Sequence, residues 1–149
     1  MRAVIQRIDT SRVVVDGREI SKTGKGLLVL LGVEKGDGKK EADSLLDKMI
    51  HLRIFEDEHG KMNQSLLDIG GELQIVSQFT LFADCRKGRR PSFTAAAEPA
   101  EARHLYDYFV NQASEKISKV GQGEFQAMMK VELVNDGPVT IFLESRKER

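Results

Sequence analysis

The sequence has few of the features that mark secreted, disulfide-rich or membrane proteins. Its 149 residues include one cysteine, three prolines and no tryptophan. A single cysteine, Cys85, excludes an internal disulfide, and it suits a reducing compartment, so we expect a cytoplasmic protein. The longest apolar run, residues 27–31, is far shorter than the roughly 20 residues that a membrane-spanning helix needs. Residues 1–7 have no apolar targeting core, and we expect neither a targeting segment nor membrane contact.

The sequence also has no net charge, because its 23 basic side chains equal its 23 acidic ones. Proteins that bind polyanions mainly by counterion release usually have a large basic excess, so general nucleic-acid binding, to DNA for example, is not expected. With 40% hydrophobic and 31% charged residues, the composition is typical of a folded protein. The length predicts one domain over residues 1–149.

Several common chemical motifs are missing. The histidines, His51, His59 and His104, are far apart in the sequence and no second cysteine accompanies them, so we expect no metal. The glycines beside Lys25 lack the spacing of a phosphate-binding loop, and residues 121–126 lack the third glycine of a dinucleotide fingerprint. No nucleophile elbow is present. We therefore expect no cofactor.

Hydrophobic spacing predicts an α+β fold. Amphipathic helices are expected at residues 39–52 and from Pro99 onward, where apolar residues recur every three or four positions. The continuous apolar run 27–31 favours a central strand covered on both faces. Turns are expected at residues 16–17 and 135–138. The other predicted strands are residues 4–8, 12–15, 18–21, 53–55, 72–82, 125–134 and 139–143. Together they predict a mostly antiparallel or mixed sheet, curled toward a barrel, with two main helices packed on it.

Polar side chains interrupt the end of the strand predicted at residues 72–82. Ser77, Gln78 and Thr80 stand where strands usually carry apolar or β-branched side chains, and such departures from local rules tend to mark functional sites. A hydrogen-bonded edge strand is the alternative explanation.

A basic loop follows this strand. It contains four cations within five positions: Arg86, Lys87, Arg89 and Arg90. Clustered guanidinium and ammonium groups are what phosphate contacts require, although a solvated charged loop has the same composition.

Two segments together resemble the paired signature of the D-aminoacyl-tRNA deacylases, also called D-tyrosyl-tRNA deacylases. They are residues 77–81, the SQFTL segment, and residues 135–140, the NDGPVT segment. The similarity covers nearly the whole chain and includes residues 1–7, 26–35, 53–55, 89–93 and 125–129. One small departure is Gln126, where glycine is more usual.

The resemblance implies a homodimeric hydrolase, free of metal and cofactor, that acts at the acceptor end of tRNA. It would cleave the ester that joins a D-amino acid, or glycine mischarged on tRNA(Ala), to the terminal adenosine. In the family the bond between Gly137 and Pro138 is cis, and this dipeptide enters the active site of the other subunit. Its carbonyl groups would leave no room for an L side chain, and Arg7 would fix its orientation.

The resemblance also assigns the reaction site to the SQFTL segment. The main-chain N–H groups of Phe79 and Thr80 would form an oxyanion hole, and Ser77 lies beside them. Gln78 and Thr80 would position the substrate or water, while the ribose hydroxyl of the substrate assists hydrolysis.

Two other functions remain open from the residues alone. The first is a non-catalytic RNA-binding module whose basic loop holds phosphates. The second is an acyl hydrolase of small esters or amides in which the hydroxyl of Thr80 is the nucleophile. A threonine nucleophile needs an adjacent base, and the sequence shows none near Thr80.

Overall fold

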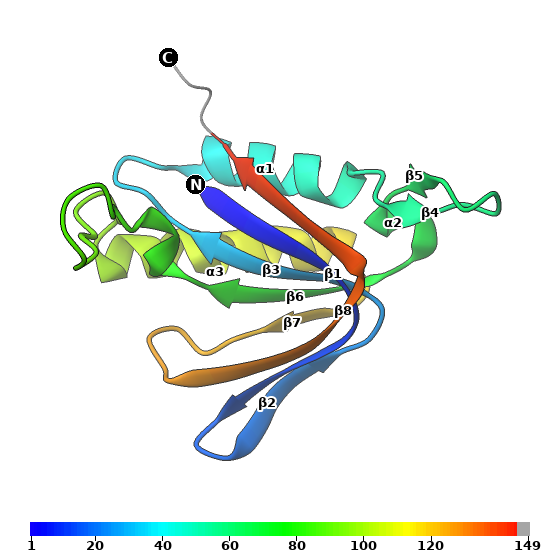
Figure 1. The fold of residues 1–149 in the computed structure, drawn as a ribbon, viewed down its shortest axis with the longest axis horizontal. Helices are drawn as coiled ribbons and strands as arrows, with labels where there is room; N and C mark the ends of the chain where they lie inside the picture. Colours follow the sequence, from blue (N-terminus) through cyan, green and yellow to red (C-terminus); the bar gives the residue numbers. More distant parts are fainter. Residues whose placement is uncertain (146–149) are drawn as a thin grey trace.

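The computed structural model of the chain describes residues 1–145 (Figure 1). Its elements are β1 (Arg2–Val15), β2 (Arg18–Thr23), β3 (Gly26–Gly32), α1 (Lys39–His51), β4 (Phe55–Glu56), β5 (Met62–Gln64), α2 (Leu66–Ile69), β6 (Glu72–Ser77), the 3₁₀ helix η1 (Phe79–Phe82), α3 (Pro99–Lys116), β7 (Val120–Gln122) and β8 (Met129–Glu144). The prediction of one domain over residues 1–149 includes residues 146–149, which lie outside the described residues.

The strands form one curled, mixed sheet beside a small β4–β5 hairpin. The order is β2-β1-β3-β6-β7, and β8 pairs with β1 along its other side. The pairs β3–β6 and β6–β7 are parallel, while β1 is antiparallel to β2, β3 and β8. The long strands β1 and β8 bend together (Figure 1). Strand β2 also reaches β6, where the Ser21 hydroxyl donates to Gln74 Oε1 at 2.8 Å. The predicted α+β fold with a barrel-like sheet is confirmed.

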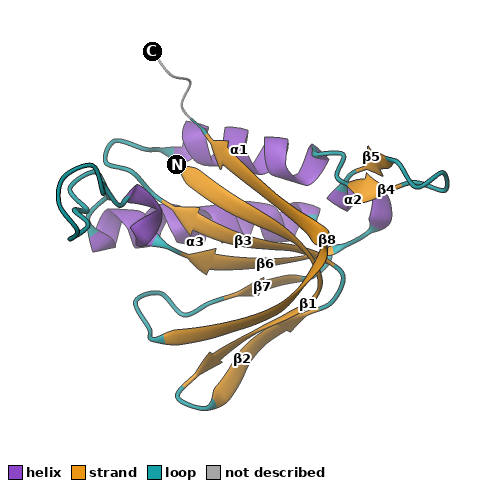
Figure 2. Ribbon diagram, viewed as in Figure 1, coloured by secondary structure: helices purple, strands orange, loops and turns teal. Residues whose placement is uncertain are grey.

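Both long helices pack on one face of this sheet (Figure 2). At the start of α1, the Glu41 carboxylate accepts a hydrogen bond of 2.8 Å from the Gly38 N–H, which satisfies one of the free donors of the first turn. Helix α3 begins at Pro99, where the missing N–H costs nothing. Both helices lie where the spacing of apolar residues predicts them.

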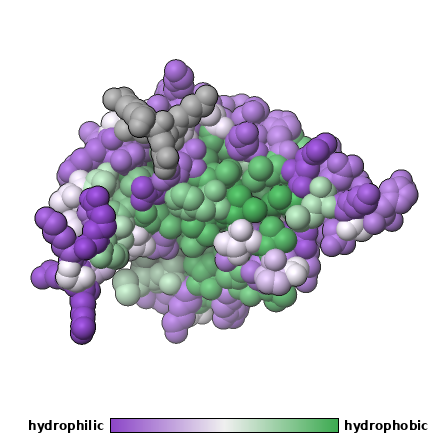
Figure 3. Space-filling view, turned by 45° about the horizontal axis from the view of Figure 1, so that its top comes forward, coloured by the Kyte–Doolittle hydropathy of each residue, from purple (hydrophilic) through white to green (hydrophobic). Residues whose placement is uncertain are grey.

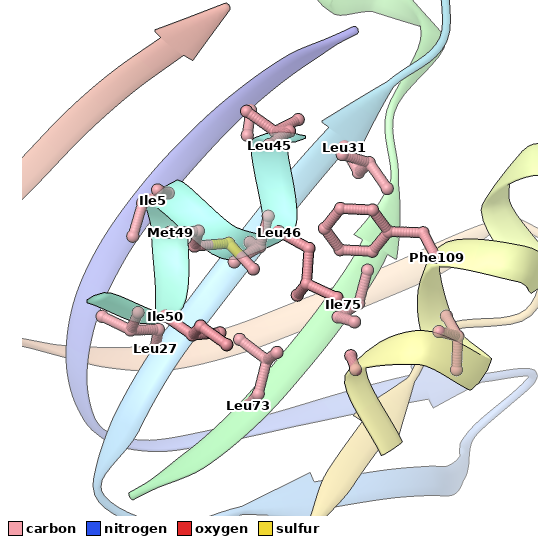
Figure 4. Packing of buried hydrophobic residues seen from close by; sticks show 14 of the residues in the cluster. Ile5, Leu27, Leu31, Leu45, Leu46, Met49, Ile50, Leu73, Ile75 and Phe109 are labelled. Atoms are coloured by element: carbon pink, nitrogen blue, oxygen red, sulfur yellow. The ribbon is translucent and has the colours of Figure 1, made fainter. Parts of the chain in front are cut away.

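The central strand β3 separates two apolar cores. Leu27, Val29 and Leu31 pack with α1 and α3 in the larger core, which Figure 4 shows around Phe109. Leu28 lies on the other face, in a small core inside the curl of the sheet. The strand is therefore buried on both faces, as its unbroken apolar run predicts.

The N-terminal strand is longer than predicted. Residues 4–8 and 12–15 belong to the single strand β1, which changes neighbour from β3 to β2 along its length. The predicted hairpin turn at residues 16–17 is confirmed: Asp16 and Gly17 both have positive φ, 49° and 75°. Two consecutive positive φ angles are typical of the type I′ turn that suits a twisted hairpin.

The prediction of one strand over residues 72–82 is wrong beyond Ser77, where β6 ends. The Gln78 N–H makes a last bond of 2.8 Å to the Leu31 carbonyl, and the neighbouring strand β3 then ends at Gly32. With no strand left to pair with, residues 79–82 turn into the helix η1. An alternating pattern alone does not show where the neighbouring strand stops.

The C-terminal strands also differ from the prediction. Strand β8 starts at Met129 rather than at residue 125, and it continues through residues 135–138, where a turn was expected. Pairing with β1 shifts register opposite Ile8, so the NDGPVT segment bulges out of the strand instead of ending it. Gln126 lies just before β8 with φ +64°, a left-handed backbone that favours glycine. The residue at which this chain departs from the family pattern, Gln126, therefore lies in a turn before β8.

Candidate functional site

The SQFTL segment joins the end of β6 to η1, and this junction leaves backbone donors available. The first N–H groups of a helix have no acceptor within it, which here applies to Phe79 and Thr80. The Gln78 side chain does not cap them. Two adjacent N–H groups therefore stand at an exposed edge of the fold, an arrangement that can bind a negatively charged oxygen.

The side chains of the SQFTL segment surround these donors. The Gln78 side-chain amide donates a hydrogen bond to the Thr80 hydroxyl, and Ser77 is half-buried at the end of β6. Phe79 is 55% exposed, and its ring meets that of Phe93 edge-on at 5.1 Å between centroids. The four residues that the family resemblance assigns to the reaction site are consecutive in the chain, and their catalytic roles stay a prediction.

The NDGPVT segment is held by a buried arginine. Arg7 is only 6% exposed, and its Nε donates to the Asp136 carbonyl at 3.2 Å while Nη1 donates to the Ile54 carbonyl at 2.7 Å. The Asp136 carboxylate lies 3.2 Å from Arg7 Nε and supplies the opposite charge. The expected contact between Arg7 and this segment is present. The role of Arg7 in chiral selectivity stays a prediction.

Gly137 packs directly against Arg7. A Cβ atom on Gly137 would lie 2.3 Å from Arg7 Nη2, and the residue has φ +109°. Only glycine accepts both conditions without strain. Backbone conformation and packing therefore both explain the glycine in this segment.

The expectation of a cis bond before Pro138 is wrong for this structure. No peptide bond among residues 1–145 is cis, so Gly137 and Pro138 are joined by a trans bond. A trans bond is the form that an X–Pro peptide prefers by about 0.5–1 kcal/mol.

The two segments lie at opposite ends of the sheet. Ser77 is in register with Leu31, and Leu31 with Ala3, whereas Gly137 lies beside Arg7. The four residues from Ala3 to Arg7 correspond to about 13 Å along a strand, and three inter-strand spacings add a similar distance across the sheet. One copy of the chain therefore does not bring the two segments together.

The basic loop has fewer available cations than its sequence indicates. Arg86 donates from Nε and Nη2 to the Asp84 carboxylate, at 2.9 and 2.7 Å. These hydrogen bonds, with one from the Arg86 main chain, lower the pKa of Asp84 to about 2. Arg86 is thus already paired, which leaves Lys87, Arg89 and Arg90 for phosphate contacts.

The three histidines lie on elements other than the SQFTL segment. His51 is on α1, His59 in the β4–β5 turn and His104 on α3. Among residues 1–145, no three His, Cys, Asp or Glu side chains are grouped so that they could hold a metal ion. No helix in the same range has the length and apolarity to cross a membrane.

Sequence reasoning missed two residues that shape the site. Phe93 was not singled out, although it lies in the segment 89–93 that carries the family resemblance. Asp84 was missed because its effect depends on its hydrogen bonds to Arg86. The short spacing of Asp84 and Arg86 in the sequence is the only signal that points to this pair.

Comparison with known proteins identifies the family. The family model described as D-Tyr-tRNA(Tyr) deacylase matches residues 4–144. The D-aminoacyl-tRNA deacylase of Syntrophus aciditrophicus (strain SB) is 62% identical over 147 residues, which is 99% of each chain. The chain belongs to the D-Tyr-tRNA(Tyr) deacylase family. The resemblance noted in the sequence is confirmed.

A second relative and a solved structure also match nearly the whole chain. The D-aminoacyl-tRNA deacylase of Clostridioides difficile (strain 630) is 58% identical over 147 residues and 99% of both chains. The solved structure of a protein called c-Myc DNA Unwinding Element Binding Protein superposes with a TM-score of 0.94 at 41% identity, covering 99% of this chain and all of that one. The similarity in sequence and in fold thus extends over about 99% of the chain.

Proposed function

We propose that this chain hydrolyses the ester bond of D-aminoacyl-tRNA and releases the D-amino acid and the tRNA. Membership of the deacylase family supports the substrate class. The observation that carries the proposal is the pair of N–H groups at Phe79 and Thr80, which stand without helical acceptors beside the side chains of Gln78 and Thr80.

The active unit is a homodimer in which each site takes the NDGPVT segment from the other subunit. The separation of the two segments within one chain supports this arrangement, because a site built from both needs a second copy. Strand β8 also supports it, since within residues 1–145 it pairs only with β1 and leaves its other edge open. Leu133, Val134 and Phe142 on β8 are exposed, and Figure 3 shows a large apolar area on one face of the molecule. Open edges and apolar areas of this kind favour association.

Chirality is read by the backbone of Gly137 and Pro138. Their carbonyl groups leave space for hydrogen alone on one side of the α-carbon, so an L side chain collides while a D side chain points away. Glycine has no side chain to exclude, and glycyl-tRNA(Ala) is therefore also hydrolysed. Arg7 keeps these carbonyls in place through its bond to the Asp136 carbonyl.

Hydrolysis uses the substrate's own ribose hydroxyl and no metal. Water adds to the ester carbonyl carbon, and the negative charge that develops on the carbonyl oxygen is stabilised by the N–H groups of Phe79 and Thr80. The bond to the ribose oxygen then breaks as the carbonyl forms again. The neighbouring ribose hydroxyl relays the proton that the attacking water loses to the leaving oxygen, so the products are the free D-amino acid and a hydroxyl of tRNA. Aminoacyl esters are already activated, so orientation and oxyanion stabilisation supply the catalysis.

The test compares D-tyrosyl-tRNA with L-tyrosyl-tRNA after treatment of the protein with a chelator. We expect rapid release of D-tyrosine and little release of L-tyrosine, and a dimer in sedimentation. Equal rates on both substrates would contradict chiral selection. Binding of tRNA without hydrolysis of either substrate would favour the non-catalytic module, and a control with single-stranded DNA shows whether such binding is specific for RNA.

Thr80→Ala should lower kcat by about 10-fold or less, because a lost positioning hydrogen bond costs about 1 kcal/mol. The Thr80 hydroxyl accepts a hydrogen bond from the Gln78 side-chain amide, and an amide cannot act as the base that a threonine nucleophile needs, which supports a positioning role. Thr80→Ser, which keeps the hydroxyl, is the control and should remain near the parent rate. A loss of several orders of magnitude in Thr80→Ala, with a trapped acyl-enzyme in the parent protein, would refute this mechanism.

Arg89→Ala should raise KM for D-aminoacyl-tRNA and reduce its salt dependence by about one unit of the log–log slope. Arg89 has the role of a phosphate contact, whereas Arg86 is paired with Asp84. The matched control is the double change Asp84→Asn with Arg86→Gln, which removes the pair at constant net charge and should leave the slope unchanged. Equal slopes for parent and Arg89→Ala would contradict a phosphate contact at Arg89.

A further inference from the structure

The position of η1 depends on contacts from outside the helix, because four residues make few internal hydrogen bonds. Its start is fixed by the bond from the Gln78 N–H to the Leu31 carbonyl, 2.8 Å long. Its body lies against Gly32, where an added Cβ would be 3.0 Å from the Phe82 ring and 3.1 Å from the Gln78 carbonyl oxygen. Helix and strand are thus in close contact, and a small displacement of η1 would move the N–H groups of Phe79 and Thr80.

Arg2 holds the other end of η1. Its Nη1 donates to the Leu81 carbonyl at 2.9 Å, and its guanidinium carbon lies 4.6 Å from the centre of the Phe82 ring. These are two consecutive residues of the helix, one held by a hydrogen bond and one by a cation–π contact.

Glu144 orients this guanidinium from the opposite strand. Glu144 is the register partner of Arg2 in β8, and its Oε1 accepts from Arg2 Nε at 2.6 Å. Arg2 therefore spans two acceptors on two elements, one on η1 and one on β8. A planar guanidinium can do this with fixed geometry, and a lysine ammonium cannot.

We propose that Arg2 is a positioning residue for deacylation, which keeps η1 where the N–H groups of Phe79 and Thr80 face the developing oxyanion. This inference rests on the proposed function. An oxyanion donor acts mainly on the transition state, and a misplacement of about 1 Å can cost 100-fold in rate. Loss of Arg2 therefore acts on kcat, while the phosphate contacts that govern substrate binding lie elsewhere.

The chain offers a matched control at the other end of the same strand pair. Arg12 and Glu132 also face each other across β1 and β8 and form an ion pair. Their Arg–Glu pair is equally part of the β1–β8 ladder, but it lies at the end of β1 far from η1. Any general effect of breaking a cross-strand ion pair appears in both variants.

The experiment compares Arg2→Met with Arg12→Met by steady-state and single-turnover hydrolysis of D-tyrosyl-tRNA and by thermal unfolding. We expect kcat to fall about 10- to 100-fold in Arg2→Met with KM changed less than threefold, and both constants to stay near the parent values in Arg12→Met. Glu144→Gln, which leaves Arg2 in place, should give the same kcat-selective loss at a smaller size, about threefold to 10-fold. This surface change also provides the readout if Arg2→Met does not fold.

The proposal is overturned by parent-like kcat in both Arg2→Met and Glu144→Gln, by an equal loss in Arg12→Met, or by a change confined to KM. In each of these cases the parent enzyme is active, so the proposed function stands without the role of Arg2. An inactive parent protein would overturn the proposed function and the role of Arg2 together.

Discussion

Replacing Gly137 by alanine is expected to lower kcat/KM for D-aminoacyl-tRNA by about 100-fold or more, since misplaced groups of this kind cost that much. The new Cβ would lie 2.3 Å from Arg7 Nη2, and φ +109° strains any L side chain. A long side chain usually moves aside at little cost. Arg7 is buried and bonded to the carbonyls of Ile54 and Asp136, so its displacement breaks the contacts that hold the NDGPVT segment.

The control for Gly137→Ala is Gly60→Ala. Gly60 also has a positive φ, +73°, but nothing lies within 4 Å of its added Cβ, and it belongs to the turn between β4 and β5. Its alanine variant also places an L side chain at a positive φ but away from the site, so its kcat/KM should stay near the parent value. Parent-like hydrolysis by Gly137→Ala, or equal losses in both variants, would contradict a special role for Gly137 in the site.

Gly26→Ala should destabilise the fold by more than about 3 kcal/mol, beyond the usual range for overpacking. An added Cβ at Gly26 would lie 1.8 Å from the carbonyl oxygen of Glu72 and 2.7 Å from its main-chain nitrogen. Both atoms belong to the backbone of β6, so no side chain can move aside. The central pair β3–β6 would have to separate at its first register position.

Thermal unfolding checks this result, with Gly24→Ala as the control. At Gly24 the nearest atom to an added Cβ is Glu72 Oε2 at 3.6 Å, an ordinary van der Waals contact. We expect Gly24→Ala to melt near the parent temperature and Gly26→Ala at least about 10 °C lower, or not to fold. A Gly26→Ala protein that melts with the parent would show that β3 and β6 do not pair as closely as described.

Local patterns in the sequence were sufficient to predict the elements that depend on burial or on backbone conformation alone. The run Leu27–Leu31 predicted a strand buried on both faces, and Asp16-Gly17 predicted its turn because few other residues adopt two positive φ angles. Prediction failed where an element is ended or continued by a distant neighbour. The alternation after Ser77 resembled a strand, but β3 had already ended; residues 135–138 resembled a turn, but β1 continued the pairing.

The sequence by itself determined the family, the α+β class and the identity of the residues in the SQFTL and NDGPVT segments, because these depend on residue types and their spacing. Only the tertiary structure decided where these residues lie. Strand register separated the two segments to opposite ends of the sheet. Arg7 contacts the Asp136 carbonyl and Arg2 contacts the Leu81 carbonyl, and in both pairs the two residues are far apart in the sequence. Such contacts depend on the distance between groups in the folded chain, which no local pattern of residues encodes.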